Sequence, residues 1–331
     1  EGMRITLEAG SEVVGHNRFG EIAVTVNPGS EVRTDNGGLL LGGANGEITD
    51  PNPERIIIDD DIYADFGLET PQDVPVVRTG DTLGEVTGVL DYSFGEFKLL
   101  AETAPEVTQG NTVEEVSELT AQKFGDLTVA TYNVLNLDPS DGDQFAQLAA
   151  DIVNNLGTPH ILGLQEIQDN NGPTDDGTVA ADVTYQMLID AIVDAGGPQY
   201  AFADSTPEDK QDGGQPGANI RVGFLYDPSV VSLTGTQRIE GDLDPEGAFD
   251  ADPTPGDGTN EGFAGTRKPL AGTFDFRGEE VTVVVNHFKS KSGDTPLSGN
   301  IQPPVEVSET QRIAQAQVVN DYVKGLLDND P

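Results

Sequence analysis

The chain has 331 residues, of which 36% are hydrophobic, and its 58 acidic and 17 basic residues give a formal net charge of −41. So negative a surface repels nucleic acid and anionic membranes, which weighs against a passive DNA-binding module. An enzyme can still bind a phosphate if metal ions and a local basic cluster lie in its cleft. We interpret the acidity as adaptation to a saline setting, because salt screens such repulsion; an acidic surface that only aids solubility is the alternative.

Cysteine is absent, so disulfides and thiolate metal sites are excluded. The chain begins at Glu1 with no initiator methionine and no apolar signal segment, and we expect a mature product or a fragment. No apolar run approaches the ~20 residues that a membrane span needs, so we expect no transmembrane segment.

Residues 1–107 are predicted to form an all-β module. Short apolar runs separated by Gly, Asn, Asp and Pro turns predict strands at 3–7, 22–26, 54–58, 74–77, 83–90 and 96–100. Because helical periodicity is lacking, a small barrel or sandwich is the natural packing. Residues 108–125 are polar and are predicted to be a linker, with a short helix at 112–119.

Residues 126–331 are predicted to form an α/β sandwich, since strands and helices now alternate. Strands are expected at 127–133, 160–165, 220–226, 270–276 and 281–286, and amphipathic helices at 144–156, 183–195 and 310–327. The segments 204–219 and 240–266 are long, acidic and rich in Gly and Pro, so they are expected to be loops.

Polar side chains end three of these strands. Thr131-Tyr-Asn-Val-Leu-Asn136 carries Asn133 at a strand tip, where α/β enzymes often build sites. Leu164-Gln-Glu-Ile167 ends an apolar strand in Glu166, and a carboxylate there is a good ligand for a hard cation. Asn286-His-Phe-Lys-Ser-Lys291 follows a run of valines and contains His287, one of three histidines, with two of the few lysines.

Each signal alone also has an ordinary structural explanation. An Asn at a strand end is often a turn residue, and His160 at the start of a buried strand is expected to be structural. His16 is expected in a polar turn. The acidic run at 59–61 is expected to be a solvated face, with Ca²⁺ binding as the alternative, since no EF-hand spacing is present.

Together these elements resemble the endonuclease/exonuclease/phosphatase superfamily, which has the DNase I-like fold. The resemblance spans about 200 residues and also includes Asn219-Ile-Arg-Val-Gly-Phe-Leu-Tyr-Asp-Pro228, Arg267-Lys-Pro-Leu270 and the helix at 309–320. That helix looks like one in the large extracellular nucleases of the superfamily. The β module is similar to the OB-like module that precedes their catalytic domain, with residues 86–97 carrying this weaker match.

The resemblance implies a role for each matched residue. Glu166 and Asn133 would hold Mg²⁺ or Mn²⁺, with Ca²⁺ also considered. His287 would be a catalytic histidine near the scissile phosphate, with Asn219 beside it. Arg267 and Lys289 would contact the substrate phosphate. A hard cation polarises a phosphoryl oxygen, histidine can transfer a proton, and arginine offers a two-pronged donor to phosphate.

The sequence departs from the family pattern in two ways. Asn219 stands where members often carry an acid, and neither the later Gly-Asp-x-Asn strand nor the terminal Asp-His pair follows His287. We therefore expect a small all-β OB-like domain followed by an incomplete DNase I-like domain.

The function implied is metal-dependent hydrolysis of phosphodiester bonds in extracellular DNA or RNA. We expect the protein to act outside the cell or at the cell surface, in a saline setting, and we expect this chain to be inactive by itself. Phosphatase or phospholipid phosphodiesterase activity of the same fold, or a non-catalytic structural fragment, are the alternatives. The oligomeric state is left open.

Overall fold

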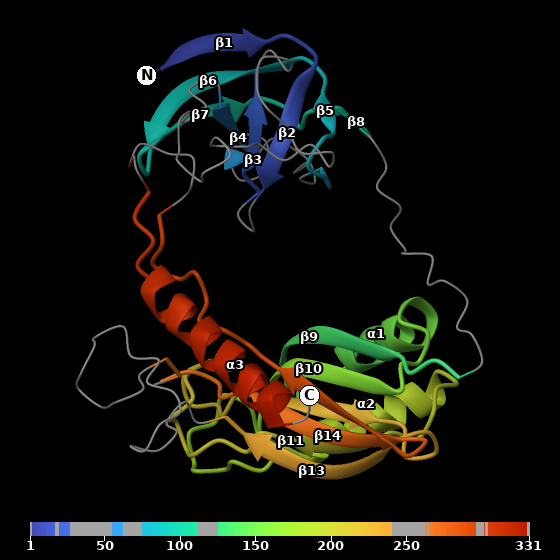
Figure 1. Ribbon diagram of the computed structural model, residues 1–331. Helices are drawn as coiled ribbons and strands as arrows, with labels where there is room; N and C mark the ends of the chain where they lie inside the picture. Colours follow the sequence, from blue (N-terminus) through green and yellow to red (C-terminus); the bar gives the residue numbers. More distant parts are fainter. Residues whose placement is uncertain are drawn as a thin grey trace. The chain divides into compact units, whose positions relative to one another are not determined.

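The computed structural model describes residues 2–16, 20–26, 55–61, 75–110, 125–239, 262–263, 265–295, 301 and 304–329 (Figure 1). The chain divides into two compact units. The first contains Glu1–Glu115 and Gly293–Glu306, and the second contains Val116–Ser292 and Val307–Pro331. The boundary near residue 115 lies within the predicted linker, whereas the assignment of Gly293–Glu306 to the first unit has no counterpart in the sequence patterns.

The first unit is built on one eight-stranded sheet. Its strands are β1 (Met3–Leu7), β2 (Ser11–His16), β3 (Ile22–Thr25), β4 (Arg55–Asp59), β5 (Thr82–Leu83), β6 (Val86–Ser93), β7 (Glu96–Ala101) and β8 (Val107–Thr108), in the order β1-β6-β7-β4-β3-β2-β5-β8. Ile5 of β1 and Val107 of β8 pack on the same core cluster as Val24 and Leu99. Strands at the two ends of the sheet order therefore share one core, which requires the sheet to curl.

Three sequence predictions in this unit need correction. The strand predicted at 74–77 is not formed by its described residues 75–77, because Pro75 has no backbone N–H to donate to a ladder. The predicted strand at 83–90 is divided between β5 and β6, which are separated by Gly84 and Glu85. His16 ends strand β2 instead of lying in a turn. The helix predicted at 112–119 lies outside the described residues.

The second unit contains a four-stranded sheet with the order β11-β12-β10-β9. Its strands are β9 (Val129–Leu137), β10 (Ile161–Ile167), β11 (Ala201–Asp204) and β12 (Arg221–Tyr226). Strand β10 is central, parallel to β9 and antiparallel to β12, and its residues are buried on both faces. Strand β9 forms an edge, and its burial alternates so that Val129, Thr131 and Asn133 remain exposed.

A three-stranded sheet packs against it. This sheet consists of β13 (Ser232–Arg238), β14 (Leu270–Phe276) and β15 (Glu279–Val285), in that order. Phe224 of β12 and Phe274 of β14 meet edge-on with ring centroids 5.5 Å apart. The approach of β10 to β15 is close: a Cβ on Gly163 would lie 3.1 Å from Val285 Cγ2. A larger residue at 163 would therefore push the two sheets apart.

Helices cover the outer faces of both sheets. Helix α1 (Gln144–Ala150), which continues as the π-helical η2 (Asp151–Asn155), packs with α2 (Asp182–Asp194) against the four-stranded sheet. Helix α3 (Glu309–Asn329) places Val318 and Tyr322 against Ala271 of β14. The layers of the second unit are thus helix, sheet, sheet, helix, so the predicted α/β sandwich is present (Figure 1). In the described part of the chain, no helix is long and apolar enough to cross a membrane.

Candidate functional site

A bulge in β10 directs the side chain of Glu166. The pairing of β10 shifts between Gln165 and Ile167 against both of its neighbours. Glu166 itself has a φ of 67°, and Leu135 and Asn136 on β9 have φ values of 55° and 53°. Left-handed conformations are unfavourable for residues with a side chain. Because all three of these residues adopt one and they lie on neighbouring strands, this part of the sheet is locally strained. The bulge takes Glu166 out of the strand alternation and turns it toward β9.

The Glu166 carboxylate is held by donors from β9. Its Oε1 accepts a hydrogen bond from Asn133 Nδ2 at 3.0 Å, and its Oε2 accepts one from the backbone N–H of Asn136 at 3.1 Å. Asn133 is fixed in turn, because its Oδ1 accepts from the N–H of Leu135 at 2.9 Å. Asn136, to which the sequence analysis assigned no role, is therefore part of the site through its backbone.

His287 approaches the same carboxylate from the other sheet, directly after β15. Its Nε2 lies 3.5 Å from Glu166 Oε1, and the two side chains are 20% and 17% exposed. Arg267 Nε donates to His287 Nδ1 at 3.2 Å. Burial, together with the positive charge of Arg267, lowers the pKa of His287 to about 4 against the opposing effect of Glu166. The imidazole is therefore neutral at pH 7.

Arg267 is the buried cation of the site, with only 8% of its surface exposed. Besides His287, it donates from Nη2 to the carbonyl oxygen of Phe288 at 2.7 Å. The following residue, Lys268, reaches the buried carboxylate of Asp212 at 2.7 Å, which Arg238 also contacts at 3.1 Å. Burial lowers the pKa of Arg267, while Glu166 and Asp212 raise it.

Lys289 is half-buried two residues beyond His287. Its backbone N–H donates to Gln315 Oε1 on α3 at 2.9 Å, which fixes the chain after β15. The structure therefore brings Asn133, Glu166, His287 and Arg267 into one contact chain, and Lys289 follows His287 by two residues in the sequence.

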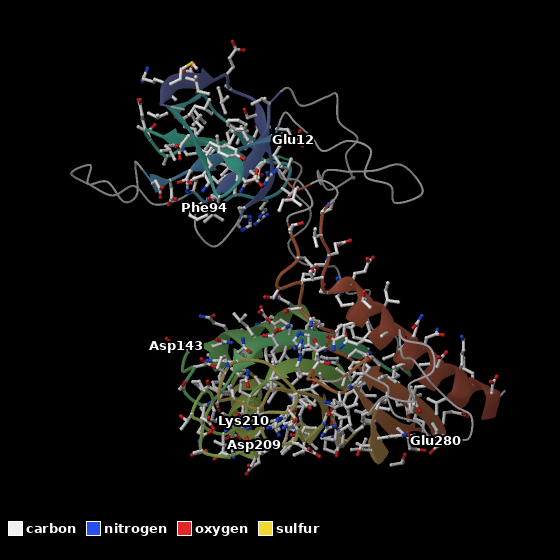
Figure 2. All side chains as sticks on the ribbon, turned by 90° about the vertical axis from the view of Figure 1, so that its left-hand side faces the viewer. Glu12, Phe94, Asp143, Asp209, Lys210 and Glu280 are labelled. Carbon is white, nitrogen blue, oxygen red and sulfur yellow. The ribbon has the colours of Figure 1, made fainter. Side chains whose placement is uncertain are left out.

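Asn219 has a different set of partners. Its N–H and Nδ2 donate to Asp169 Oδ2 at 2.9 and 3.2 Å, and its Oδ1 accepts from the N–H of Lys210 at 2.8 Å. None of these bonds reaches His287, and Asn219 is 2% exposed. It fastens the loop before β12, where Figure 2 shows the side chains of Asp209 and Lys210 side by side.

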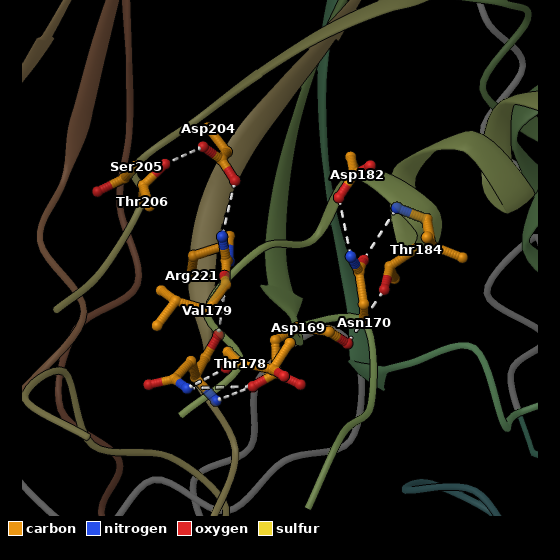
Figure 3. Close-up of polar contacts among 12 residues, drawn as sticks. Asp169, Asn170, Thr178, Val179, Asp182, Thr184, Asp204, Ser205, Thr206 and Arg221 are labelled. Carbon is orange, nitrogen blue, oxygen red and sulfur yellow. Dashed lines mark hydrogen bonds and ion pairs between the residues drawn. The ribbon is translucent and has the colours of Figure 1, made fainter. Parts of the chain in front are cut away.

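Asp169 belongs to a buried polar network that the sequence analysis did not identify. Arg221, 1% exposed, donates from Nη1 to Asp204 at 2.9 Å and also contacts the Val179 carbonyl oxygen (Figure 3). The carbonyl oxygen of Asp169 accepts from Thr184 Oγ1 at 3.2 Å. These bonds anchor the loop that follows Glu166, so their role is structural support for the site.

The donor set around Glu166 fits a hard divalent cation. One carboxylate and one amide side chain lie together, and Mg²⁺ is commonly bound through one or two carboxylates while keeping several waters. Asn133 would have to turn its Oδ1 from Leu135 to become a ligand. Arg267, which contacts His287, supplies a positive charge that suits a phosphate as a further partner.

A groove adjoins the site between the two sheets. It has a volume of about 400 Å³ and is bordered by the edge strands β9 and β15 and by β10. Its lining residues are Val129, Ala130, Thr131, Gly163, Gln165, Val283, Val284, Val285 and Asn286. The lining mixes apolar residues with a few polar ones, and Asn133 and His287 lie next to it in sequence.

The acidic run in the first unit differs from the expectation of a solvated face. Asp59, Asp60 and Asp61 are the one group of three potential metal-binding side chains in the described residues. Asp59 is 3% exposed and pairs with Lys98 Nζ at 2.9 Å, and Lys98 also pairs with Glu21. A lysine therefore compensates the buried charge of Asp59.

Comparison with known proteins finds partial similarities. Residues 1–112 match the family model of a domain of unknown function (DUF8508). No curated protein matches the chain.

Among solved structures, a humanized TDP2 from D. rerio is 16% identical with a TM-score of 0.35, covering 60% of this chain and 56% of its own. An endonuclease/exonuclease/phosphatase from Bacteroides vulgatus is 14% identical with a TM-score of 0.36, covering 61% of each chain. A mannosyl-6-phosphatase from Bacteroides thetaiotaomicron is 15% identical with a TM-score of 0.33, covering 61% of this chain and 60% of its own. The chain therefore spans 56 to 61% of the length of these three. A function for this chain must therefore be argued from the side chains of this chain itself.

Proposed function

We propose that the second unit is a divalent-metal-dependent phosphodiesterase domain of the endonuclease/exonuclease/phosphatase superfamily. The observation that supports this most directly is the contact chain from Asn133 through Glu166 and His287 to Arg267. Two sheets contribute these residues: Asn133 lies within β9, Glu166 lies near the end of β10, and Arg267 and His287 lie before β14 and after β15. A strained bulge turns the carboxylate of Glu166 toward Asn133 and His287. Strain of this kind is retained where function requires it.

Each side chain has a distinct task in this proposal. Glu166 and Asn133 hold Mg²⁺ or Mn²⁺, which when bound would polarise a phosphoryl oxygen and stabilise the leaving oxygen. His287 contacts the phosphate from the opposite sheet. Arg267 and Lys289 supply positive charge that offsets the acidic surface. Asn219 anchors the supporting loop and has no direct role in the chemistry.

Nucleic acid is the proposed substrate. In a chain of net charge −41, Arg267 contacts His287 and Lys289 follows His287 by two residues, and a local basic cluster of this kind is what a polyanion needs in order to approach. Phosphomonoesters or phospholipids present the same phosphate chemistry and remain the second candidates. We place the activity outside the cell or at its surface, in a saline medium, because salt would screen the rest of the surface.

We further propose that the groove between β9 and β15 receives an additional strand-forming segment, which supplies the water-orienting acid and the second histidine. Both bordering strands are edges, and an exposed edge is a template for strand addition. Val129, 48% exposed at the groove, would then be covered. Residues 1–331 alone are accordingly expected to turn over little substrate, because losing one preorganised group can cost ~10²–10³ in rate. The OB-like character of the first unit remains part of the proposal.

A plasmid-nicking assay tests the function. The 331-residue chain and a longer version bearing the completing strands are incubated with Mg²⁺ or Mn²⁺ at low and high salt, with excess chelator and Glu166→Gln as controls. We expect cleavage in the longer protein that both controls abolish, and little in the shorter one. Cleavage that survives the chelator, or a longer protein that cleaves neither nucleic acid nor a small phosphodiester, contradicts the proposal.

A further inference from the structure

The two ring nitrogens of His287 have different neighbours. Nδ1 lies 3.2 Å from Arg267 Nε, and Nε2 lies 3.5 Å from Glu166 Oε1. Turning the ring over about its Cβ–Cγ bond would place carbon atoms against both partners, so the observed orientation is the one that gives each nitrogen a polar contact. The identities of these two partners decide where the imidazole carries its proton.

A guanidinium group offers only donors and stays protonated in proteins. The contact from Arg267 Nε therefore requires His287 Nδ1 to accept, which means that Nδ1 carries no proton. A neutral imidazole then has its single proton on Nε2. The Nε2–H faces a carboxylate oxygen of Glu166, which is an acceptor. Both contacts consequently favour the same tautomer.

Arg267 is itself fixed by a second hydrogen bond. Its Nη2 donates to the Phe288 carbonyl oxygen at 2.7 Å, so one guanidinium grips both the ring of His287 and the backbone beside it. The next residue, Lys268, is anchored by the buried Asp212 at 2.7 Å. With 8% of its surface exposed, Arg267 is placed to act on His287 and has little freedom to reach a ligand by itself.

We propose that Arg267 is a positioning residue that orients His287 with Nδ1 as an acceptor and the proton on Nε2, so that the ring presents a hydrogen-bond donor to the phosphate on its Glu166 side. This inference rests on the proposed function for the identity of the ligand, and it deepens that function in two ways. His287 becomes a donor to a phosphate oxygen and not a base. Arg267 acts through His287, and direct phosphate contact falls to Lys289.

The test reads the tautomer without metal or substrate. The 331-residue chain is prepared with ¹⁵N-labelled histidine and arginine, and long-range ¹H–¹⁵N correlations are recorded near neutral pH. The chain has only three histidines, and a His287→Asn variant identifies the signals of His287. We expect His287 to show an unprotonated Nδ1, a protonated Nε2, and a coupling across the hydrogen bond between Nδ1 and Arg267 Nε.

Arg267→Met removes the donor while keeping a side chain of similar length. The two nitrogen shifts of His287 should then move toward each other as the second tautomer becomes populated. His160 is the internal control, because its Nδ1 accepts from the backbone N–H of Thr128 at 3.1 Å and should keep its pattern.

A protonated Nδ1 or a missing trans-hydrogen-bond coupling in the unaltered chain would overturn the proposal, and the His287→Asn chain serves only to assign the signals. Unchanged His287 shifts in an Arg267→Met chain whose His160 pattern is intact would overturn it as well. If the nitrogen signals contradict the proposed tautomer, the proposals on metal binding and hydrolysis still stand. If the longer protein shows no hydrolysis, the proposed tautomer still stands. The two proposals can therefore be contradicted separately.

Discussion

At the scale of single residues, Glu166 has both an unusual backbone conformation and several polar contacts. Its backbone is left-handed, its carboxylate accepts from Asn133 and Asn136, and His287 lies 3.5 Å away. Without these contacts a non-glycine residue would relax from this conformation, which costs of order 1–3 kcal/mol. The local strain and the polar contacts therefore support each other.

Replacement of Glu166 by Gln should weaken metal binding. The amide removes the negative charge and would turn a donor toward Asn133 Nδ2 or the Asn136 N–H. We expect Mn²⁺ affinity, measured by titration calorimetry, to fall by at least about tenfold, since the loss of merely the outer partners of metal ligands costs 10–100-fold. Glu279→Gln on the exposed part of β15 is the matched control and should bind as the unaltered chain does. Equal affinity in the two variants would rule out Glu166 as a ligand.

Replacement of His287 by Ala should separate binding from turnover. In the completed protein we expect the rate of phosphodiester cleavage to drop ~10²–10³-fold, the usual loss for one preorganised group. The Mn²⁺ affinity should stay within a few-fold, because His287 is assigned to the phosphate. A large loss of metal affinity would instead identify His287 as a ligand.

The residue patterns anticipated part of this site. Asn133, Glu166, Arg267 and His287 lie in short motifs of the sequence, and the structure places them in contact. The expected strand end at Asn133 was wrong, because β9 continues to Leu137. The hydrogen bond from Arg267 to His287 could not be read from the sequence, because it joins two loops through side-chain geometry. The position of Asn219 likewise depends on Asp169, a loop residue with no distinctive sequence context.

At the scale of the elements, burial on both faces made β10 and β12 easy to predict. Their continuous apolar runs are typical of central strands. Strand β13 has Thr, Gly and Gln at exposed positions and lacks alternation, so its pairing with β14 leaves little trace in the sequence. The division of β5 from β6 was also hidden, because β-propensity does not report where a sheet curls.

Truncation of Phe224 should show that the two sheets of the second unit share one core. Phe224 is fully buried and meets Phe274 edge-on across the layers. We expect Phe224→Ala to lower the unfolding free energy of this unit by about 3–5 kcal/mol. The measurement is urea-dependent hydrogen exchange of the β10 and β14 amides.

Val129→Ala on the edge strand is the control for this substitution, since Val129 is 48% exposed, and it should cost less than ~1 kcal/mol. Similar losses for both variants would mean that Phe224 is not part of an inter-sheet core.

At the scale of the whole molecule, the formal net charge of −41 is the main influence that we expect on the dependence of stability on salt. Repulsion between like charges at this density opposes the compact state. Salt screens this repulsion, with a Debye length of roughly 3 Å at 1 M. We therefore expect the melting temperature to rise between about 0.1 M and about 2 M KCl.

Neutralising exposed acids provides the matched control for this salt effect. Asp194→Asn, Glu279→Gln and Glu280→Gln should raise the melting temperature at low salt and reduce its dependence on KCl. Asp194 lies at the C-terminal end of α2, where a negative charge also opposes the helix dipole. A melting temperature independent of KCl would show that the acidity serves solubility alone.

The most direct test of the account is paramagnetic broadening by Mn²⁺ in the histidine-labelled chain. A cation held by Glu166 and Asn133 would lie within a few ångströms of His287, whose Nε2 is 3.5 Å from Glu166 Oε1. The account predicts that His287 signals broaden at substoichiometric Mn²⁺, before those of His16 and His160, and that Glu166→Gln removes this selectivity. Signals of His287 that stay sharp while those of another histidine broaden, or broadening unchanged in Glu166→Gln, would contradict it.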